Sequence, residues 1–61
     1  MKVNYDIMAD AVYINVSKAK VARTVKTDDR FLVDVDAHGN VVGIEILDAS
    51  NQQELVKNLE K

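Results

Sequence analysis

The stretch that decides the fold is Phe31-Leu-Val-Asp-Val-Asp-Ala-His-Gly-Asn-Val-Val-Gly-Ile-Glu-Ile-Leu47. Two runs of alternating apolar residues flank a turn over residues 37–40, and this arrangement predicts a β-hairpin. If Asp36 faces Val41 and Val35 faces Val42, one face of the hairpin is entirely apolar. That face carries Phe31, Val33, Val35, Val42, Ile44 and Ile46. A slip by one residue would turn this set toward solvent, so the pattern specifies the register of the hairpin.

Three further strands are predicted before the hairpin. Together with the hairpin they give five strands, over residues 2–6, 11–17, 21–27, 31–36 and 41–47. The second strand places Val12, Ile14 and Val16 on one side, which is the side we expect to be buried. The phase of the third strand stays open, because its two valines share a face with Arg23.

After residue 47 the apolar pattern changes from a period of two to helical spacing. Two leucines and a valine beyond residue 53 recur on one helical face, and Ser50 with Gln53 matches a capping box. An isolated helix shorter than about 12 residues is marginal in water. We therefore expect a helix over residues 51–60 to lie across the apolar face of the sheet. The predicted fold class is α+β: a single small domain over residues 1–61, with an antiparallel β-meander of four to five strands and one C-terminal α-helix packed on one face.

Composition excludes more functions than it indicates. The chain has 61 residues, a net charge of −2 and no cysteine, so it has neither a disulfide framework nor a thiolate zinc site. This charge gives no general attraction to nucleic acid or anionic lipid. No stretch approaches the roughly 20 apolar residues of a membrane helix, and the N-terminus has no signal-peptide pattern. We expect a cytoplasmic location and no membrane association.

Five of the eight basic residues fall close together in the middle of the chain. They are Lys18, Lys20, Arg23, Lys26 and Arg30. Lysines on an edge strand commonly prevent unwanted strand pairing. A phosphate-binding face would also be expected to carry aromatic side chains for stacking, and this segment has none. Edge protection is the preferred interpretation, and a nucleic-acid-binding accessory protein is the alternative.

Two blocks of the sequence resemble a known family. Residues 9–14, Ala-Asp-Ala-Val-Tyr-Ile, and residues 41–50, Val-Val-Gly-Ile-Glu-Ile-Leu-Asp-Ala-Ser, are similar to blocks of the short prokaryotic proteins grouped as domain of unknown function 2283. The resemblance runs from about Val3 to Ser50. It implies a small β-rich domain with a C-terminal helix and no established activity. For some relatives it also implies an antitoxin-like role as the partner of a small toxin.

The resemblance has one departure in the first turn. Ile7-Met8 stands where the family usually has Pro-Glu. We therefore expect this turn to be more apolar than in relatives.

The hairpin segment has several features of a calcium-binding loop. Asp34, Asp36 and Glu45 occupy the first, third and twelfth positions of such a loop, and Gly39 occupies the sixth. In the predicted hairpin, however, Asp34 and Glu45 point off the outer face of the sheet rather than toward a common point. His38 also fills a position where calcium sites use an oxygen ligand. We predict solvated carboxylates and no metal site, and a divalent-metal or small-ligand binder is the least favoured alternative.

No residue pattern indicates catalysis. His38 is the only histidine, and the chain has no glycine-rich phosphate loop. A domain of this size also has little material with which to enclose a deep, dry cleft. No catalytic residue, cofactor or metal ligand is predicted, and the chain is expected not to be an enzyme.

The remaining candidate site is the mixed outer face of the sheet. A glycine in mid-strand, such as Gly43, usually marks a bulge or the close approach of another backbone or ring. Space for the ring of Tyr13 in the same chain is an equal alternative. The predicted interaction residues are Tyr13, Leu32, Val41, Gly43 and Leu47.

The small size of the domain favours association. A domain this short without cross-links has little net stability, so a second copy or another small protein is expected to cover its apolar residues. The predicted function is a protein–protein interaction module, which we expect to be homodimeric.

Overall fold

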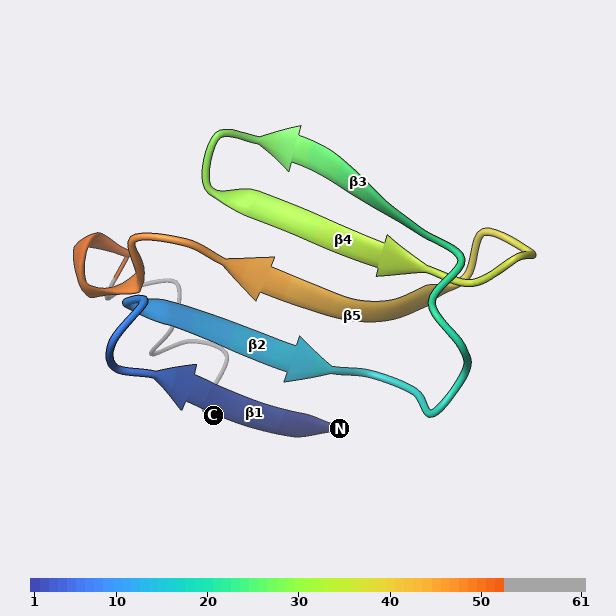
Figure 1. The fold of residues 1–61 in the computed structure, drawn as a ribbon, viewed down its shortest axis with the longest axis horizontal. Coiled ribbons are helices and arrows are strands. Elements are labelled where there is room, and N and C mark those ends of the chain that lie inside the picture. The colour runs from blue at the N-terminus through green and yellow to red at the C-terminus, as the bar shows by residue number, and fades with distance from the viewer. Residues whose placement is uncertain (53–61) are drawn as a thin grey trace.

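The computed structural model describes residues 1–52, which form one five-stranded antiparallel sheet (Figure 1). The elements are β1 (Lys2–Asp6), β2 (Ala11–Asn15), β3 (Arg23–Asp28), β4 (Phe31–Val35), β5 (Val41–Ile46) and a 3-10 turn, η1 (Ala49–Asn51). All five predicted strands are present, with ends that differ from the predicted ones by two residues or fewer.

The order of the strands shows that the predicted meander is wrong. The order across the sheet is β1-β2-β5-β4-β3, so β2 pairs with β5 at the centre (Figure 1). The connection over residues 16–22 must therefore pass from β2 to the far edge. Seven extended residues reach about 23 Å, which exceeds the roughly 14 Å between strands three positions apart. β2 and β5 contain the most buried residues of the five strands, and pairing them keeps both away from the edges.

The predicted α+β class is also wrong for the described residues. Within residues 1–52 the only helical element is the three-residue η1, and no helix is long and apolar enough to cross a membrane. The helix predicted over residues 51–60 lies, from residue 53 onward, outside the described residues. Ser50, predicted as its N-cap, lies inside η1, and its hydroxyl donates to Asp10 Oδ2 at 2.7 Å. Ser50 therefore ties the end of the sheet to the β1–β2 turn.

The β4–β5 hairpin keeps the predicted register along most of its length. Val33 pairs with Ile44 as predicted, but near the turn Val35 pairs with Val41 rather than with Val42. Two residues of β5 thus oppose one residue of β4, which is a β-bulge. Val42 is 2% exposed and Val41 is 41% exposed. The bulge therefore leaves Val42 buried and Val41 exposed.

Asp36 and Gly39 hold the turn of this hairpin. Asp36 Oδ1 accepts hydrogen bonds from the backbone N–H groups of His38 at 2.8 Å and Asn40 at 2.9 Å. Gly39 has a φ of +82°, a left-handed conformation that glycine adopts at little cost, and it thereby closes the turn predicted over residues 37–40. The N–H groups of Asn40 and His38 lower the pKa of Asp36, because they stabilise its ionised carboxylate.

The other strands differ from prediction mainly at their ends. β2 ends at Asn15, so Val16, which was predicted to be buried, is exposed. Its N–H still donates to Val42 O at 2.8 Å. The phase of β3 follows from its pairing, since Val25 faces Val33 and so lies on the core side of the sheet.

The hydrophobic core lies on one face of the central strands. Val12, Ile14 and Ile46 are buried and form one cluster with Ala49 of η1. Phe31 packs against this cluster from β4 and is half-buried. The core thus joins the second strand of the chain to the last one.

Candidate functional site

A row of side chains crosses four strands on the outer face of the sheet. Tyr13 of β2 lies against Gly43 of β5, and its hydroxyl donates to Asp34 Oδ2 at 3.0 Å. Asp34 Oδ1 accepts a second hydrogen bond from Thr24 Oγ1 of β3 at 2.6 Å. We call Tyr13, Gly43, Asp34 and Thr24 the tyrosine row.

The tyrosine row explains the glycine in mid-strand. A β-carbon at position 43 would lie 2.5 Å from Tyr13 Cζ and closer still to the hydroxyl oxygen, which is nearer than real β-carbons approach. Of the two explanations that the sequence left open, the structure supports the ring of Tyr13 in the same chain. A β-bulge also lies beside Gly43, at Val41 and Val42. Burial, together with the hydrogen bond to Asp34, raises the pKa of Tyr13.

The predicted interaction residues do not form one apolar surface. Glu45 lies between Tyr13 and Leu32, because it pairs with both. Leu32 and Leu47 are half-buried, whereas Val41 is exposed at the bulge. The structure thus brings Tyr13 and Gly43 into contact and separates Tyr13 from Leu32 by a carboxylate.

Two of the three carboxylates of the calcium-like segment accept hydrogen bonds within the chain. Asp34 accepts from Tyr13 and Thr24, and Asp36 accepts from its own turn. In the part of the chain that the structure describes, no group of three or more His, Cys, Asp or Glu side chains is arranged to hold a metal ion. These two carboxylates therefore stabilise the sheet and its turn.

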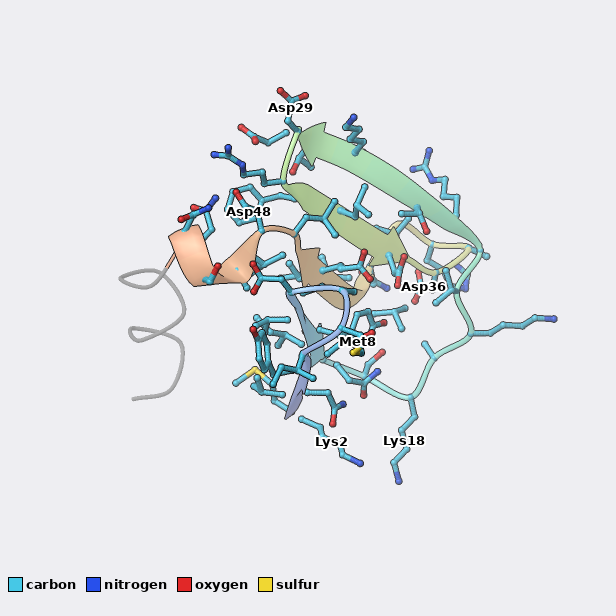
Figure 2. All side chains as sticks on the ribbon, turned by 60° about the vertical axis from the view of Figure 1, so that its left-hand side comes forward. Lys2, Met8, Lys18, Asp29, Asp36 and Asp48 are labelled. Atoms are coloured by element: carbon cyan, nitrogen blue, oxygen red, sulfur yellow. The ribbon has the colours of Figure 1, made fainter. Side chains whose placement is uncertain are left out.

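The basic residues follow the β2–β3 connection and the β3 edge. β3 is an edge strand with all six residues exposed, as edge protection requires. Figure 2 shows Lys18 projecting from the β2–β3 connection. Lys26 Nζ lies 4.0 Å from Asp29 Oδ1, and Arg30 Nε lies 3.5 Å from Asp48 Oδ2. Two of the five cations are therefore next to carboxylates, which reduces the positive charge available to a phosphate.

The opposite edge of the sheet carries the most exposed apolar side chains of the described residues. Those on β1 and the residues around it are Met1, Val3, Tyr5, Ile7 and Met8, which are 86%, 41%, 54%, 76% and 92% exposed. We call this set the β1 surface. β1 is an edge strand, and all five of its residues are exposed. Figure 2 shows Lys2 of β1 at one end of the molecule and Asp29, beyond β3, at the other.

Sequence reasoning missed the β1 surface as a site. It placed Val3 and Tyr5 on the first strand, which a meander also leaves at an edge, but it named no residue of that edge as a site. The available signal lay in the turn after β1, because Ile7 and Met8 are apolar where turns usually carry Gly, Pro, Asn, Asp or Ser.

Asp10 holds the turn beside the β1 surface. Its backbone has a φ of +49°, a left-handed conformation in which aspartate is enriched. Its carboxylate accepts hydrogen bonds from the Tyr5 hydroxyl at 2.9 Å, the Ser50 N–H at 3.1 Å and the Ser50 hydroxyl at 2.7 Å. The hydrogen bonds from Ser50 and Tyr5 lower the pKa of Asp10. The hydrogen bond between Tyr5 and Asp10 also raises the pKa of Tyr5. Asp10 thereby anchors Tyr5 at the β1 edge.

We expect acid to destabilise the domain through Asp10 and Asp36. Both carboxyls have a lowered pKa in the folded state. Their contribution is therefore present above the unfolded pKa of roughly 3.9 and is lost as the pH falls through the lower folded values. Urea unfolding at a series of pH values should show a steeper acid loss for the native chain than for the Asp10→Asn, Asp36→Asn double variant. Equal slopes would mean that folding does not favour the ionised form of either carboxyl.

Comparison with known proteins confirms the resemblance seen in the sequence. The family model described as "Protein of unknown function (DUF2283)" matches residues 2–50. An uncharacterised protein of Methanocaldococcus jannaschii is 41% identical over an alignment of 66 positions, which covers 100% of this chain and 56% of that protein. The chain thus spans little more than half the length of this relative. No solved structure matches the chain significantly. Because the family model covers all five strands, the chain belongs to the DUF2283 family of proteins of unknown function.

Proposed function

We propose that this chain is a protein-interaction module that binds a protein partner along β1. The supporting observation is that an edge strand coincides with the four most exposed large apolar side chains of the described residues. An edge strand presents unpaired N–H and C=O groups that can bind a further strand, and neighbouring side chains add affinity and specificity. The proposed activity is binding rather than catalysis.

The two edges of the sheet differ in a way that favours β1. β3 carries Arg23 and Lys26, and its pairing shifts between Lys26 and Asp28. Charged side chains and bulges both discourage strand addition. β1, in contrast, pairs with β2 in unbroken register from Lys2 to Asp6. A regular strand of this kind offers a regular row of backbone groups to a partner.

The outer face is a weaker candidate for the same role. In the tyrosine row, the Tyr13 hydroxyl and both Asp34 oxygens are already hydrogen-bonded within the chain. A partner would have to replace these bonds, whereas the β1 surface offers apolar side chains directly. The partner is either a second copy or a different small protein, and an antitoxin-like role would take the second form.

Ile7→Lys is expected to prevent binding to the partner protein. Ile7 is 76% exposed, so the substitution should leave the fold intact while placing a charge in the apolar surface. Loss of an apolar hot-spot contact typically weakens an interface by roughly 30-fold or more. The measurement passes an extract of the source cells over the immobilised chain and identifies every protein that is retained. A retained second copy of the chain counts as a partner.

Val21→Lys is the matched control for this experiment. Val21 is also an exposed β-branched apolar residue, but it lies in the β2–β3 connection, away from β1. Its substitution should leave retention unchanged. Equal retention by the Ile7→Lys chain, or no retained protein at all, would contradict the proposal.

A further inference from the structure

We infer that the partner of β1 is a second copy of this chain, with the two β1 strands paired antiparallel about a two-fold axis at Asn4. Such pairing would join two five-stranded sheets into one continuous sheet. The inference rests on the proposed function, because it names the partner of the same edge.

The hydrogen bonds of the sheet leave suitable backbone groups free on β1. In antiparallel strands the N–H and C=O groups of successive residues point to alternate sides. Val16 N–H donates to Val42 O, so the even-numbered residues of β2 bond β5 and the odd-numbered ones bond β1. The residues of β1 that face these odd-numbered residues are even-numbered. Val3 and Tyr5 therefore direct their N–H and C=O groups away from the sheet.

An axis at Asn4 also matches the side chains of the two copies. Val3 then lies opposite Tyr5 of the second copy, and Lys2 lies opposite Asp6, with each pair occurring twice by symmetry. Aromatic residues opposite β-branched ones, and opposite charges, are favourable cross-strand pairs. The strand is thus complementary to itself in both backbone and side chains.

Asp6 can serve both its own turn and the second copy. Its Oδ1 accepts the N–H groups of Met8 at 3.1 Å and Ala9 at 3.2 Å. No described residue donates a hydrogen bond to its Oδ2. This oxygen is therefore available to Lys2 of the second copy.

Other registers match the strand less well. Val3 and Tyr5 must supply the hydrogen bonds, so the axis can lie at Val3, Asn4 or Tyr5. An axis at Val3 places Lys2 opposite Asn4, and an axis at Tyr5 places Asp6 opposite Asn4. Only the axis at Asn4 pairs all five residues of β1 and joins opposite charges.

The same axis collects the apolar side chains that a single copy exposes. Val3 pairs with Ile14 of β2, and Tyr5 pairs with Val12 of β2. Because Ile14 and Val12 are core residues, Val3 and Tyr5 lie on the core side of the sheet. Met1 precedes the strand and Ile7 follows it, and the two-fold axis brings Met1 of one copy to Ile7 of the other. Val3 and Tyr5 of the two copies would then form a continuous apolar strip across the interface on the core side.

A single cysteine at position 4 tests the position of the axis. The chain has no cysteine, so Asn4→Cys introduces one thiol per copy. Residues of a non-hydrogen-bonded antiparallel pair lie about 4.5 Å apart at Cα, which suits a disulfide. We expect mild oxidation to produce a covalent dimer of Asn4→Cys. The control Lys2→Cys should not cross-link, because its two thiols would lie about 13 Å apart along the strand.

Val3→Pro tests the outward hydrogen bond separately. Proline there removes an N–H that points away from the sheet, so the fold should be retained. The control Val3→Ala also loses the valine side chain but keeps the N–H. We expect sedimentation to give a dimer for the native chain and a dissociation constant roughly ten-fold higher for Val3→Pro than for Val3→Ala. Circular dichroism establishes that both variants are folded.

The outcomes separate this inference from the proposed function. A native chain that stays monomeric at high concentration would overturn self-pairing, while the proposed function would stand if Ile7→Lys still prevents capture of a different protein. A dimer that cross-links through Lys2→Cys and not through Asn4→Cys would overturn the axis at Asn4. If neither self-association nor capture is seen, both proposals fail.

Discussion

Ile46→Ala is expected to destabilise the domain by about 2–5 kcal/mol. Ile46 is 1% exposed, and it belongs to the core cluster formed by β2, β5 and η1. Total stability at this size is roughly 3–9 kcal/mol, so the substitution removes a large part of it and the urea midpoint should fall strongly. Urea unfolding followed by circular dichroism measures the loss.

Val41→Ala is the control for the core substitution. It shortens an apolar side chain on the same strand, but Val41 is 41% exposed at the bulge. Its cost should stay within about 0.5 kcal/mol. Similar losses for the two variants would mean that the core is not centred on the inner face of β5.

Gly43→Ala should destabilise the domain by about 1–3 kcal/mol, although it adds only one methyl group. The new β-carbon would occupy the space of the Tyr13 ring, so the ring must move. Moving the ring breaks the hydrogen bond between the Tyr13 hydroxyl and Asp34. Thermal and urea unfolding of the two chains provide the measurement.

The effect of Gly43→Ala should change sign when Tyr13 is first replaced by threonine. Threonine keeps a side chain suited to a strand but is too short to reach across Gly43. Alanine in a strand is then better than glycine by about 0.5–1 kcal/mol, because it loses less conformational freedom on folding. A persistent loss in the Tyr13→Thr background would place the strain in the backbone of β5 rather than in the ring contact.

The β4–β5 hairpin shows what the alternation of apolar residues can predict. The pattern correctly paired Val33 with Ile44, because only one phase buries the apolar set. It did not predict the bulge. The alternation did place Val42 rather than Val41 on the buried side, as the structure confirms, but it carries no signal for an extra residue in one strand.

The order of the strands was beyond the reach of the sequence pattern. Ala11–Asn15 alternates in the same way at the centre of a sheet as at its edge, and the connection over residues 16–22 is long enough for either arrangement. The partner of β2 is determined by packing between segments that lie far apart in the chain. The error in strand order does not explain why the β1 surface was missed, because a meander also leaves the first strand at an edge.

The candidate site was predicted in part. Tyr13 and Gly43 were proposed as neighbours because a glycine in mid-strand needs a reason, and the structure supplies that reason. The hydrogen bonds of Asp34 to Tyr13 and Thr24 depend on how three strands line up. No local sequence signal contains that information.

The central pairing of β2 with β5 has a consequence for synthesis of the chain. β2 leaves the ribosome some thirty residues before its partner, since it ends at Asn15 and β5 ends at Ile46. Contacts between segments so far apart slow folding, because the intervening loop must be closed first. Until Ile46 emerges, Val12 and Ile14 have no core to enter, so the apolar side chains of β2 stay uncovered while the intervening strands are synthesised.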